Sequence, residues 1–249
     1  MRVLGVIPAR LGSTRLPHKP LQLLAGEPLI TRVIERVLDH DLVDELVVAS
    51  DSPMVAEVVK RSGVTTVLTE ESHPTGTDRV AEVAARLEFA RFDVIVNIQG
   101  DEPFLSREAL SGSLARVEQG DDIGTAATPL DAALASDPNR VKVVTDAGGR
   151  ALYFSRAVIP HRREPGEPVH GLYWQHVGIY AYSRAAITRW VTLPPCAAEQ
   201  AERLEQLRAV YYGLSVGVAR LDEPALPGVD TVEDLRRAEA HWYAYQGQV

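Results

Sequence analysis

The sequence has 249 residues, 45% of them hydrophobic and 24% charged, which is typical of a folded globular protein rather than a disordered chain. Its 26 basic and 34 acidic residues give a formal net charge of −8, so we expect no broad nucleic-acid-binding surface. It has one cysteine, Cys196, no signal-peptide core and no apolar run of membrane-spanning length. These features indicate a cytoplasmic protein without disulfides and without a membrane partner.

Short apolar runs alternate with helical patterns through the first part of the chain. The predicted elements are, in chain order, a strand at 3–7, a helix at 28–38, a strand at 46–49, a helix at 55–61, a strand at 64–68, a helix at 78–87 and a strand at 94–98. Such strand-helix-strand units need right-handed crossovers, so they predict an α/β, Rossmann-like fold with a mostly parallel sheet and helices on both faces.

The second half follows a different pattern. Val141–Val144 and Ala151–Phe154 flank the turn residues Asp146–Gly149, which predicts an antiparallel hairpin. The elements expected after it are an exposed loop at 161–168, a strand at 178–182, a helix at 185–190, a strand at 216–221 and an amphipathic helix from about 231 to 243. Because no linker or internal repeat divides the chain, we expect a single domain over 1–249 with an inserted antiparallel lobe at approximately 140–190.

A basic loop follows the first predicted strand, where such folds usually bind phosphates. Gly12 would let backbone N–H groups approach an anion closely, and Ser13 adds a hydroxyl donor. Arg10, Arg15 and Lys19 supply the positive charge that a polyphosphate needs. The loop has neither the P-loop nor the GxGxxG pattern, so a solvated basic loop is the alternative interpretation.

One carboxylate stands where a hard metal ion could bind. Asp101 comes shortly after the predicted strand 94–98, at a strand's carboxyl end. Mg²⁺ is typically held by one or two carboxylates together with phosphate oxygens, so Asp101 is a candidate ligand, although it could also close a turn. Asp230 precedes Thr231 and Asp234 in a pattern that predicts the cap and first turn of a helix.

Several segments carry a family resemblance that extends almost from end to end. The loop Pro8–Leu21 resembles the N-terminal signature of sugar-activating nucleotidyltransferases, and its stretch Arg15–Leu21 resembles the cytidylyltransferase branch in particular. Further segments resemble motifs of the CMP-Kdo synthetases, which are 3-deoxy-manno-octulosonate cytidylyltransferases: Thr75–Arg79, Asn97–Pro103, Tyr153–Arg156, His176–Tyr180, Leu204–Arg208 and Gly228–Thr231. We therefore expect a nucleotidyltransferase domain.

The resemblance implies roles for individual residues. Asp101 and Asp230 would hold Mg²⁺, with Glu102 as the alternative if Asp230 only caps a helix. The implied catalytic residues are Arg10, Arg15, Lys19 and Asp101. The implied nucleotide-binding residues are Ala9, Arg10, Gly12, Ser13, Lys19, Thr75, Gly76 and Arg79. Arg79 would anchor the cytosine, although the segment alone is equally compatible with a helix N-cap.

A second group of polar residues suits an acidic sugar, which needs donors for its carboxylate and hydroxyl groups. The implied sugar-binding residues are Gln99, Arg156, His176, Tyr180, Glu205 and Gln206. By itself His176 is more typical of a structural histidine, and Tyr180 on an alternating strand could belong to the core.

The activity that the resemblance implies is transfer of CMP from CTP to 3-deoxy-D-manno-octulosonate (Kdo) by a Mg²⁺-dependent homodimer, for lipopolysaccharide biosynthesis. The alternatives are a cytidylyltransferase for another acidic sugar (an amino-Kdo, another nonulosonate or a neuraminate) and a non-catalytic nucleotide-binding protein. The sequence departs from the family pattern at three places. His18 stands where glycine is common, Val232 stands where proline is common, and the loop 162–171 matches poorly.

Overall fold

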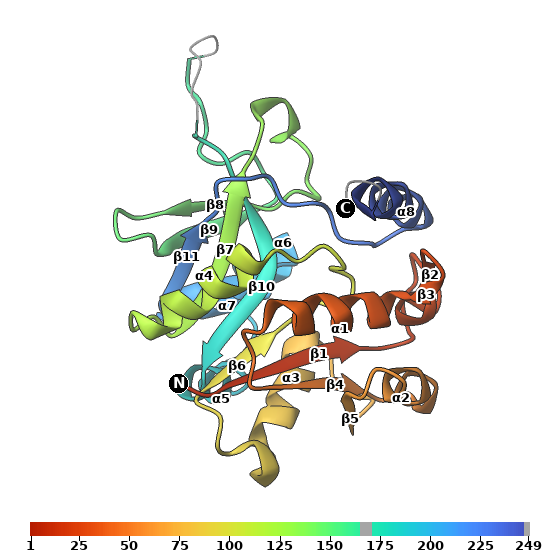
Figure 1. The fold of residues 1–249 in the computed structure, drawn as a ribbon. Coiled ribbons are helices and arrows are strands. Elements are labelled where there is room, and N and C mark those ends of the chain that lie inside the picture. The colour runs from red at the N-terminus through yellow and green to blue at the C-terminus, as the bar shows by residue number, and fades with distance from the viewer. Residues whose placement is uncertain (165–170, 247–249) are drawn as a thin grey trace. The chain divides into compact units, whose positions relative to one another are not determined.

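The computed structural model describes residues 1–164 and 171–246 and contains two compact units (Figure 1). The first unit comprises Met1–Leu105 and Leu226–Val249, and the second comprises Ser106–Ala225. The first unit is therefore discontinuous in sequence, because its last segment follows the whole of the second.

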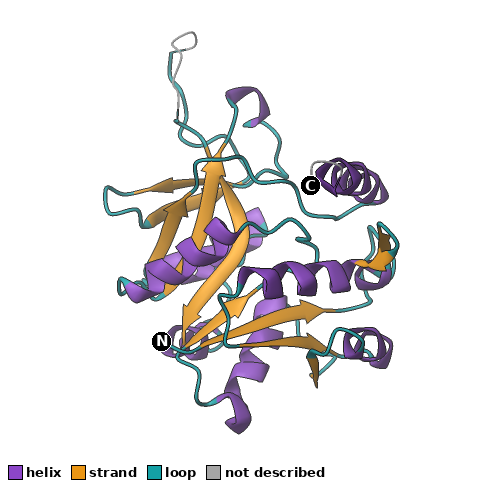
Figure 2. Cartoon of the chain, in the orientation of Figure 1, coloured by secondary structure: helices purple, strands orange, loops and turns teal. Residues whose placement is uncertain are grey.

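The first unit alternates strands and helices, as Figure 2 shows. Its elements are β1 (Val3–Ala9), the 3-10 helix η1 (Lys19–Leu21), β2 (Leu23–Leu24), β3 (Glu27–Pro28), α1 (Leu29–His40), β4 (Glu45–Ser50), α2 (Pro53–Lys60), β5 (Thr65–Leu68), α3 (Gly76–Ala85), the 3-10 helix η2 (Leu87–Phe89), β6 (Val94–Asn97) and α8 (Val232–Gln246). The strands β6, β1, β4 and β5 lie in this order and are all parallel.

The order of these strands reverses direction at β1. The chain moves from β1 through α1 to β4 and through α2 to β5, and then returns through α3 to β6 on the other side of β1. Right-handed crossovers that run in opposite directions place their helices on opposite faces of the sheet, as α1 and α3 lie in Figure 1. This reversal creates a topological switch point at the carboxyl ends of β1 and β6, where open α/β sheets bind ligands.

Helix α1 shows how the apolar pattern determines packing. Leu29, Ile30, Val33, Ile34 and Val37 are spaced on one helical face and are all fully buried. The strands β4 and β6 are similarly buried, and in β1 six of the seven residues are buried, whereas β5 buries only Val67. A sheet covered on both faces needs such nearly continuous apolar strands.

The second unit mixes parallel and antiparallel pairing. Its elements are α4 (Arg107–Glu118), β7 (Ile123–Pro129), the 3-10 helix η3 (Ala132–Leu134), β8 (Lys142–Thr145), β9 (Ala151–Ser155), β10 (Trp174–Ser183), α5 (Arg184–Trp190), α6 (Ala197–Glu202), α7 (Gln206–Tyr211) and β11 (Val216–Arg220). β7 pairs in parallel with β11 and antiparallel with β10, whose register shifts between Val177 and Tyr180. β8 and β9 form an antiparallel hairpin, as predicted.

The predicted fold class, a mostly parallel α/β sheet with a smaller antiparallel part, is confirmed. The predicted lobe at 140–190 lies inside the second unit, which is wider, and the description of 1–249 as a single domain stays a prediction. Helix α3 begins at Gly76, two residues before its predicted start. None of the helices in the described part of the chain combines the length and apolar character needed to cross a membrane.

Candidate active site

The basic loop after β1 is fixed at a few points and otherwise exposed. Leu16 is only 2% exposed and packs in an apolar cluster, and its N–H donates to Ser13 Oγ at 3.3 Å. Around Gly12 an added Cβ would meet nothing within 4 Å, so the backbone there is open to a ligand. Arg10 and Arg15 are exposed in the same loop, at the carboxyl edge of the sheet.

Backbone geometry explains the departures at His18 and Val232. His18 has a φ of 53°, in the left-handed region that glycine adopts without a steric penalty. Val232 is the first residue of α8, where the fixed φ of proline suits the helix. Both departures therefore affect local backbone preference, and neither removes a charged group.

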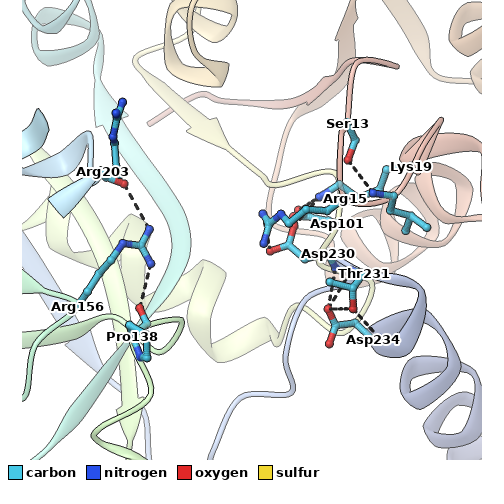
Figure 3. A network of polar contacts seen from close by, with 11 residues as sticks. Ser13, Arg15, Lys19, Asp101, Pro138, Arg156, Arg203, Asp230, Thr231 and Asp234 are labelled. Carbon is cyan, nitrogen blue, oxygen red and sulfur yellow. Dashed lines mark hydrogen bonds and ion pairs between the residues drawn. The ribbon is translucent and has the colours of Figure 1, made fainter. Parts of the chain in front are cut away.

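Four of the predicted residues converge around one ammonium group (Figure 3). Lys19 Nζ lies 2.5 Å from Asp101 Oδ2 and 2.8 Å from Asp230 Oδ1. Arg15 Nη2 lies 3.1 Å from Asp230 Oδ2. The structure thus brings together Arg15, Lys19, Asp101 and Asp230, the last of which is 211 positions from Lys19 in the sequence.

Asp101 reaches this place because the loops after β1 and β6 pass close to each other. The Ile98 N–H donates to Val6 O at 3.0 Å, which extends the pairing of β6 with β1. A Cβ on Gly100 would lie only 3.1 Å from Pro8 O, so the small residue permits this approach. Asp101 is therefore presented at the switch point beside the basic loop.

Asp230 is brought to the same place by the chain that returns from the second unit. The Val229 N–H donates to Asp101 O at 2.8 Å, and Val229 is fully buried. A Cβ on Gly228 would lie 3.0 Å from Glu102 Oε1, so a larger residue would crowd this contact. The backbone bond and the close approach together hold the two aspartates side by side.

The cap of α8 is formed by Thr231 and Asp234. Thr231 Oγ1 accepts a hydrogen bond from the Asp234 N–H at 3.1 Å, and Asp234 Oδ2 accepts one from the Thr231 N–H at 2.9 Å. Asp234 Oδ2 also accepts a longer bond from the Asp230 N–H at 3.3 Å. Thr231, rather than Asp230, therefore caps the helix, and the carboxylate of Asp230 contacts Lys19 and Arg15.

The cluster shifts the pKa values of its members. Burial opposes the charge on Lys19, but the Asp101 and Asp230 carboxylates outweigh it and raise the pKa of the ammonium. Burial also opposes the charge on Asp230, yet the contacts with Lys19 and Arg15 lower the pKa of that carboxyl. Burial, followed by the charges of Asp101 and Asp230, raises the pKa of Glu102 to about 8. Glu102 is therefore mostly protonated at neutral pH, which makes it a poorer metal ligand than either aspartate.

The segment implied to hold the nucleotide base begins helix α3. Thr75 Oγ1 accepts a hydrogen bond from the Asp78 N–H at 3.2 Å, so Thr75 is the N-cap. Arg79 is only 3% exposed, its Nη2 lies 2.8 Å from Asp51 Oδ2, and its Nη1 donates to Thr69 Oγ1. This placement gives Arg79 a structural role, tying α3 to the ends of β4 and β5. Its predicted contact with cytosine stays a prediction.

Of the six residues implied to bind the sugar, Gln99 lies in the first unit and the other five lie in the second. Arg156 is held by three backbone carbonyls: Nε donates to Glu202 O at 2.7 Å, Nη1 to Pro138 O at 3.0 Å and Nη2 to Arg203 O at 3.4 Å. The two outer contacts are drawn in Figure 3. These bonds fix the orientation of the guanidinium.

His176 and Tyr180 lie together on β10, with ring centroids 5.3 Å apart. Thr125 Oγ1 donates a hydrogen bond to Ile179 O at 2.7 Å, so it accepts a hydrogen bond from His176 Nε2, which lies 3.0 Å away. Burial lowers the pKa of His176 to about 3, so the ring is neutral at physiological pH. These contacts agree with a structural histidine, and its predicted contact with a sugar stays a prediction.

Glu205 and Gln206 lie at the start of α7. Gln206 is its first residue and is buried, and Glu205 directly precedes it. Burial, followed by the charges of Tyr182 and Glu205, raises the pKa of Tyr180 well above its ordinary value. The charge of Glu205 thus contributes to the environment of Tyr180, and the predicted contacts of both residues with a sugar stay predictions.

Lys142, which was not among the predicted site residues, binds the backbone of Arg156. Lys142 is fully buried, and its Nζ donates to Arg156 O at 2.7 Å and to Asp137 O at 3.1 Å. A signal was present, because a lysine inside the apolar run Val141–Val144 is unusual. Glu202 Oε2 accepts a hydrogen bond from the Arg156 N–H at 2.8 Å, but no feature of the sequence around Glu202 indicated this contact.

A parallel sheet with a basic loop and paired carboxylates at its switch point is the architecture of an α/β nucleotide-binding protein. The comparison with known proteins is more specific. A family model described as Cytidylyltransferase matches residues 4–217, and the chain belongs to that family.

Curated relatives identify the branch of the family. A 3-deoxy-manno-octulosonate cytidylyltransferase of Gemmatimonas aurantiaca is 52% identical over 245 residues, covering 97% of this chain and 95% of that protein. The protein of the same name from Methylococcus capsulatus is 44% identical, covering 95% of each chain. The solved structure of a CMP:2-keto-3-deoxy-manno-octonic acid synthetase complexed with CTP has a TM-score of 0.91 and 38% identity, covering 98% of this chain and 100% of that one. The expected family is confirmed.

Proposed function

We propose that the chain transfers CMP from CTP to Kdo, giving CMP-Kdo and pyrophosphate. The observation that carries the proposal is the pairing of Asp101 and Asp230 with Arg15 and Lys19 at the switch point. Similarity over nearly the whole chain to a synthetase complexed with CTP supports CTP as the nucleotide. The names of the curated relatives support Kdo as the acceptor.

The proposed metal ion is Mg²⁺, with Asp101 and Asp230 as its protein ligands. In the described residues no group of three or more histidine, cysteine, aspartate or glutamate side chains could hold a metal ion. Two carboxylates nevertheless fit Mg²⁺, which usually takes one or two from the protein and the remaining oxygens from phosphates and water. When bound, Mg²⁺ would stabilise charge on the α-phosphate and acidify the attacking hydroxyl.

The side chains of the loop would handle the phosphates. The anomeric hydroxyl of the sugar attacks the α-phosphorus in line, so the protein forms no covalent intermediate. Arg10, Arg15 and Lys19 neutralise the pyrophosphate as it leaves, and the backbone around Gly12 approaches the phosphate oxygens. Catalysis then depends on positioning and on charge stabilisation rather than on a nucleophilic side chain.

The sugar would be recognised by polar groups of the second unit, among them Arg156. The fixed guanidinium of Arg156 supports a role in binding the sugar carboxylate, because an oriented guanidinium suits a planar anion. The loop 162–171, which departs from the family pattern, falls largely outside the described residues. A panel of acidic sugars therefore has to separate Kdo from an amino-Kdo, another nonulosonate and a neuraminate.

We also propose that the protein is a cytoplasmic homodimer that supplies lipopolysaccharide biosynthesis. Leu152 on β9 is 58% exposed, and its neighbour Tyr153 is also exposed. These apolar side chains support an interface at the antiparallel hairpin of β8 and β9. Sedimentation equilibrium of the wild type and of Leu152→Ser would test this interface, and a monomeric wild type would contradict it.

Pyrophosphate release tests the proposed activity. We expect release only with CTP, Mg²⁺ and Kdo together, with much lower rates for UTP, ATP and GTP, because a site that hydrogen-bonds one base leaves polar groups unpaired with another. Asp101→Asn and Asp230→Asn should fold normally and lose most turnover, since each removes a hard anionic ligand. Equal use of UTP and CTP, or near-wild-type turnover by either variant, would contradict the proposal.

A further inference from the structure

The two aspartates at the switch point are already engaged by basic side chains of the loop. Lys19 Nζ contacts Asp101 Oδ2 and Asp230 Oδ1, and Arg15 Nη2 contacts Asp230 Oδ2. Three of the four carboxylate oxygens therefore contact a cation that belongs to the chain. Any divalent ion that uses these oxygens has to compete with Lys19 for two of them.

The charges of this cluster balance. Two carboxylates carry two negative charges, and Lys19 and Arg15 carry two positive charges, so the group is neutral as it stands. Adding a divalent ion alone would leave two positive charges in excess beside a side chain that is only 18% exposed. Adding the ion together with a triphosphate brings the compensating negative charge.

We propose that Lys19 is the resident counter-ion of the Asp101–Asp230 pair, and that a divalent ion gains these oxygens only when a nucleoside triphosphate draws Lys19 away. The inference rests on the proposed function for the identity of the nucleotide and of the metal ligands. It adds an order of events: the phosphates and the metal bind together, and the lysine exchanges carboxylate partners for phosphate partners.

The position of Lys19 suits such an exchange because only its side chain has to move. The backbone is fixed by η1, in which Leu21 N donates to His18 O at 2.8 Å and Gln22 N donates to Lys19 O at 3.1 Å. Pro20 is buried and limits the backbone further. An ammonium on a flexible four-carbon stem can reorient from such a base, whereas the shared contacts keep the aspartates in place beforehand.

Removing the charge of Lys19 should therefore turn the carboxylate pair into a site for a free divalent ion. We would titrate Mn²⁺ alone, without nucleotide, into the full chain and follow bound Mn²⁺ by electron paramagnetic resonance. The variants are Lys19→Met and, in case that variant fails to fold, Lys19→Gln. The expected result is that either neutral variant binds Mn²⁺ roughly tenfold or more tightly than the wild type.

Two control variants locate the effect. Lys60→Met removes the same charge at the exposed end of α2, and its Mn²⁺ affinity should match the wild type. Adding Asp230→Asn to Lys19→Met should abolish the gain, because one of the two carboxylates is lost. An equal gain in Lys60→Met would mean that net charge alone is responsible and would overturn the proposal.

The remaining outcomes separate this inference from the proposed function. If Lys19→Met and Lys19→Gln bind Mn²⁺ no more tightly than the wild type, the counter-ion role is wrong even if the wild type makes CMP-Kdo. If the gain appears but the wild type releases no pyrophosphate from CTP and Kdo, the counter-ion role stands and the proposed function is wrong.

Discussion

Asp234 provides a sharp test of how the second aspartate is positioned. Its Oδ2 accepts hydrogen bonds from the Thr231 N–H at 2.9 Å, from Thr231 Oγ1 at 2.8 Å and from the Asp230 N–H at 3.3 Å. Loss of a helix cap typically costs about 1 kcal/mol, and bonds to a charged acceptor about 1.5–3 kcal/mol before solvent screening. Because Asp234 is partly exposed, we expect Asp234→Ala to lower the free energy of unfolding by about 1–2 kcal/mol.

The same change should reduce turnover, because the backbone of Asp230 loses one of its fixed points. We expect kcat for pyrophosphate release to fall roughly ten- to a hundredfold and the Mg²⁺ concentration for half-maximal rate to rise, since small misplacements of a ligand are costly. The melting temperature should fall by about 2–8 °C. Asp234→Asn keeps an oxygen acceptor, so its values should lie between those of the wild type and Asp234→Ala.

Glu233→Gln is the control, because Glu233 is the preceding residue and, within the described residues, forms ion pairs with the exposed Arg236 and Arg237 of α8. Its contact with Arg237 is 3.3 Å long, and such exposed pairs are worth about 0.5 kcal/mol or less. If Asp234→Ala lowers the melting temperature but leaves kcat and the Mg²⁺ dependence unchanged, the cap supports only α8. Identical behaviour of the two variants would refute the positioning argument altogether.

Three further results are expected. Arg79→Met should lower the free energy of unfolding by about 2–3 kcal/mol, measured with denaturant, because it removes the buried guanidinium and leaves its partly buried partner Asp51 unpaired. A changed base preference with intact stability would instead support the cytosine contact. Because the pKa of His176 is lowered to about 3, below its unfolded value, the free energy of unfolding should decrease as pH falls below about 6.5, by up to about 1.4 kcal/mol per pH unit. In His176→Gln, unfolding curves at pH 7 and pH 5 should differ less than they do for the wild type. His18→Gly should raise the free energy of unfolding by about 1 kcal/mol, because it relieves left-handed backbone strain. Val232→Pro should raise it by about 0.4–1 kcal/mol, because proline restricts the unfolded chain. Both variants should therefore melt at a higher temperature, and an unchanged melting temperature in both would contradict these backbone arguments.

The fold of the first unit could be predicted from sequence because its signals are local. The strand predicted at 94–98 is found at Val94–Asn97, and the helix predicted at 28–38 is found at Leu29–His40. Helix α4 and strand β7, in the second unit, were not predicted, because β7 consists largely of small residues and the buried face of α4 includes Ala109 and Ser113. A Cβ on Gly124 of β7 would lie 1.9 Å from Ser113 O of α4, so close packing replaces the bulky apolar residues that mark other elements.

The candidate site was predicted more completely for its chemistry than for its contacts. The types of residue at Lys19 and Asp101 indicated phosphate and metal binding, and the family resemblance implied the metal role of Asp230. Their shared contact, however, depends on a fold that joins distant positions. For Arg79 the sequence showed a cation near a helix start. Its partner Asp51 lies 28 positions earlier, and no local pattern indicates that the two side chains pair.

The discontinuity of the first unit has a consequence for protein synthesis. A ribosome releases the basic loop and Asp101 early, whereas Gly228 and Asp230 emerge only after the entire second unit. The bond from the Val229 N–H to Asp101 O cannot form until then. A nascent or prematurely terminated chain that ends before this segment would contain Asp101 but not Asp230. If the pair holds the metal ion as proposed, we expect such a chain to be inactive even though its first strands are already present.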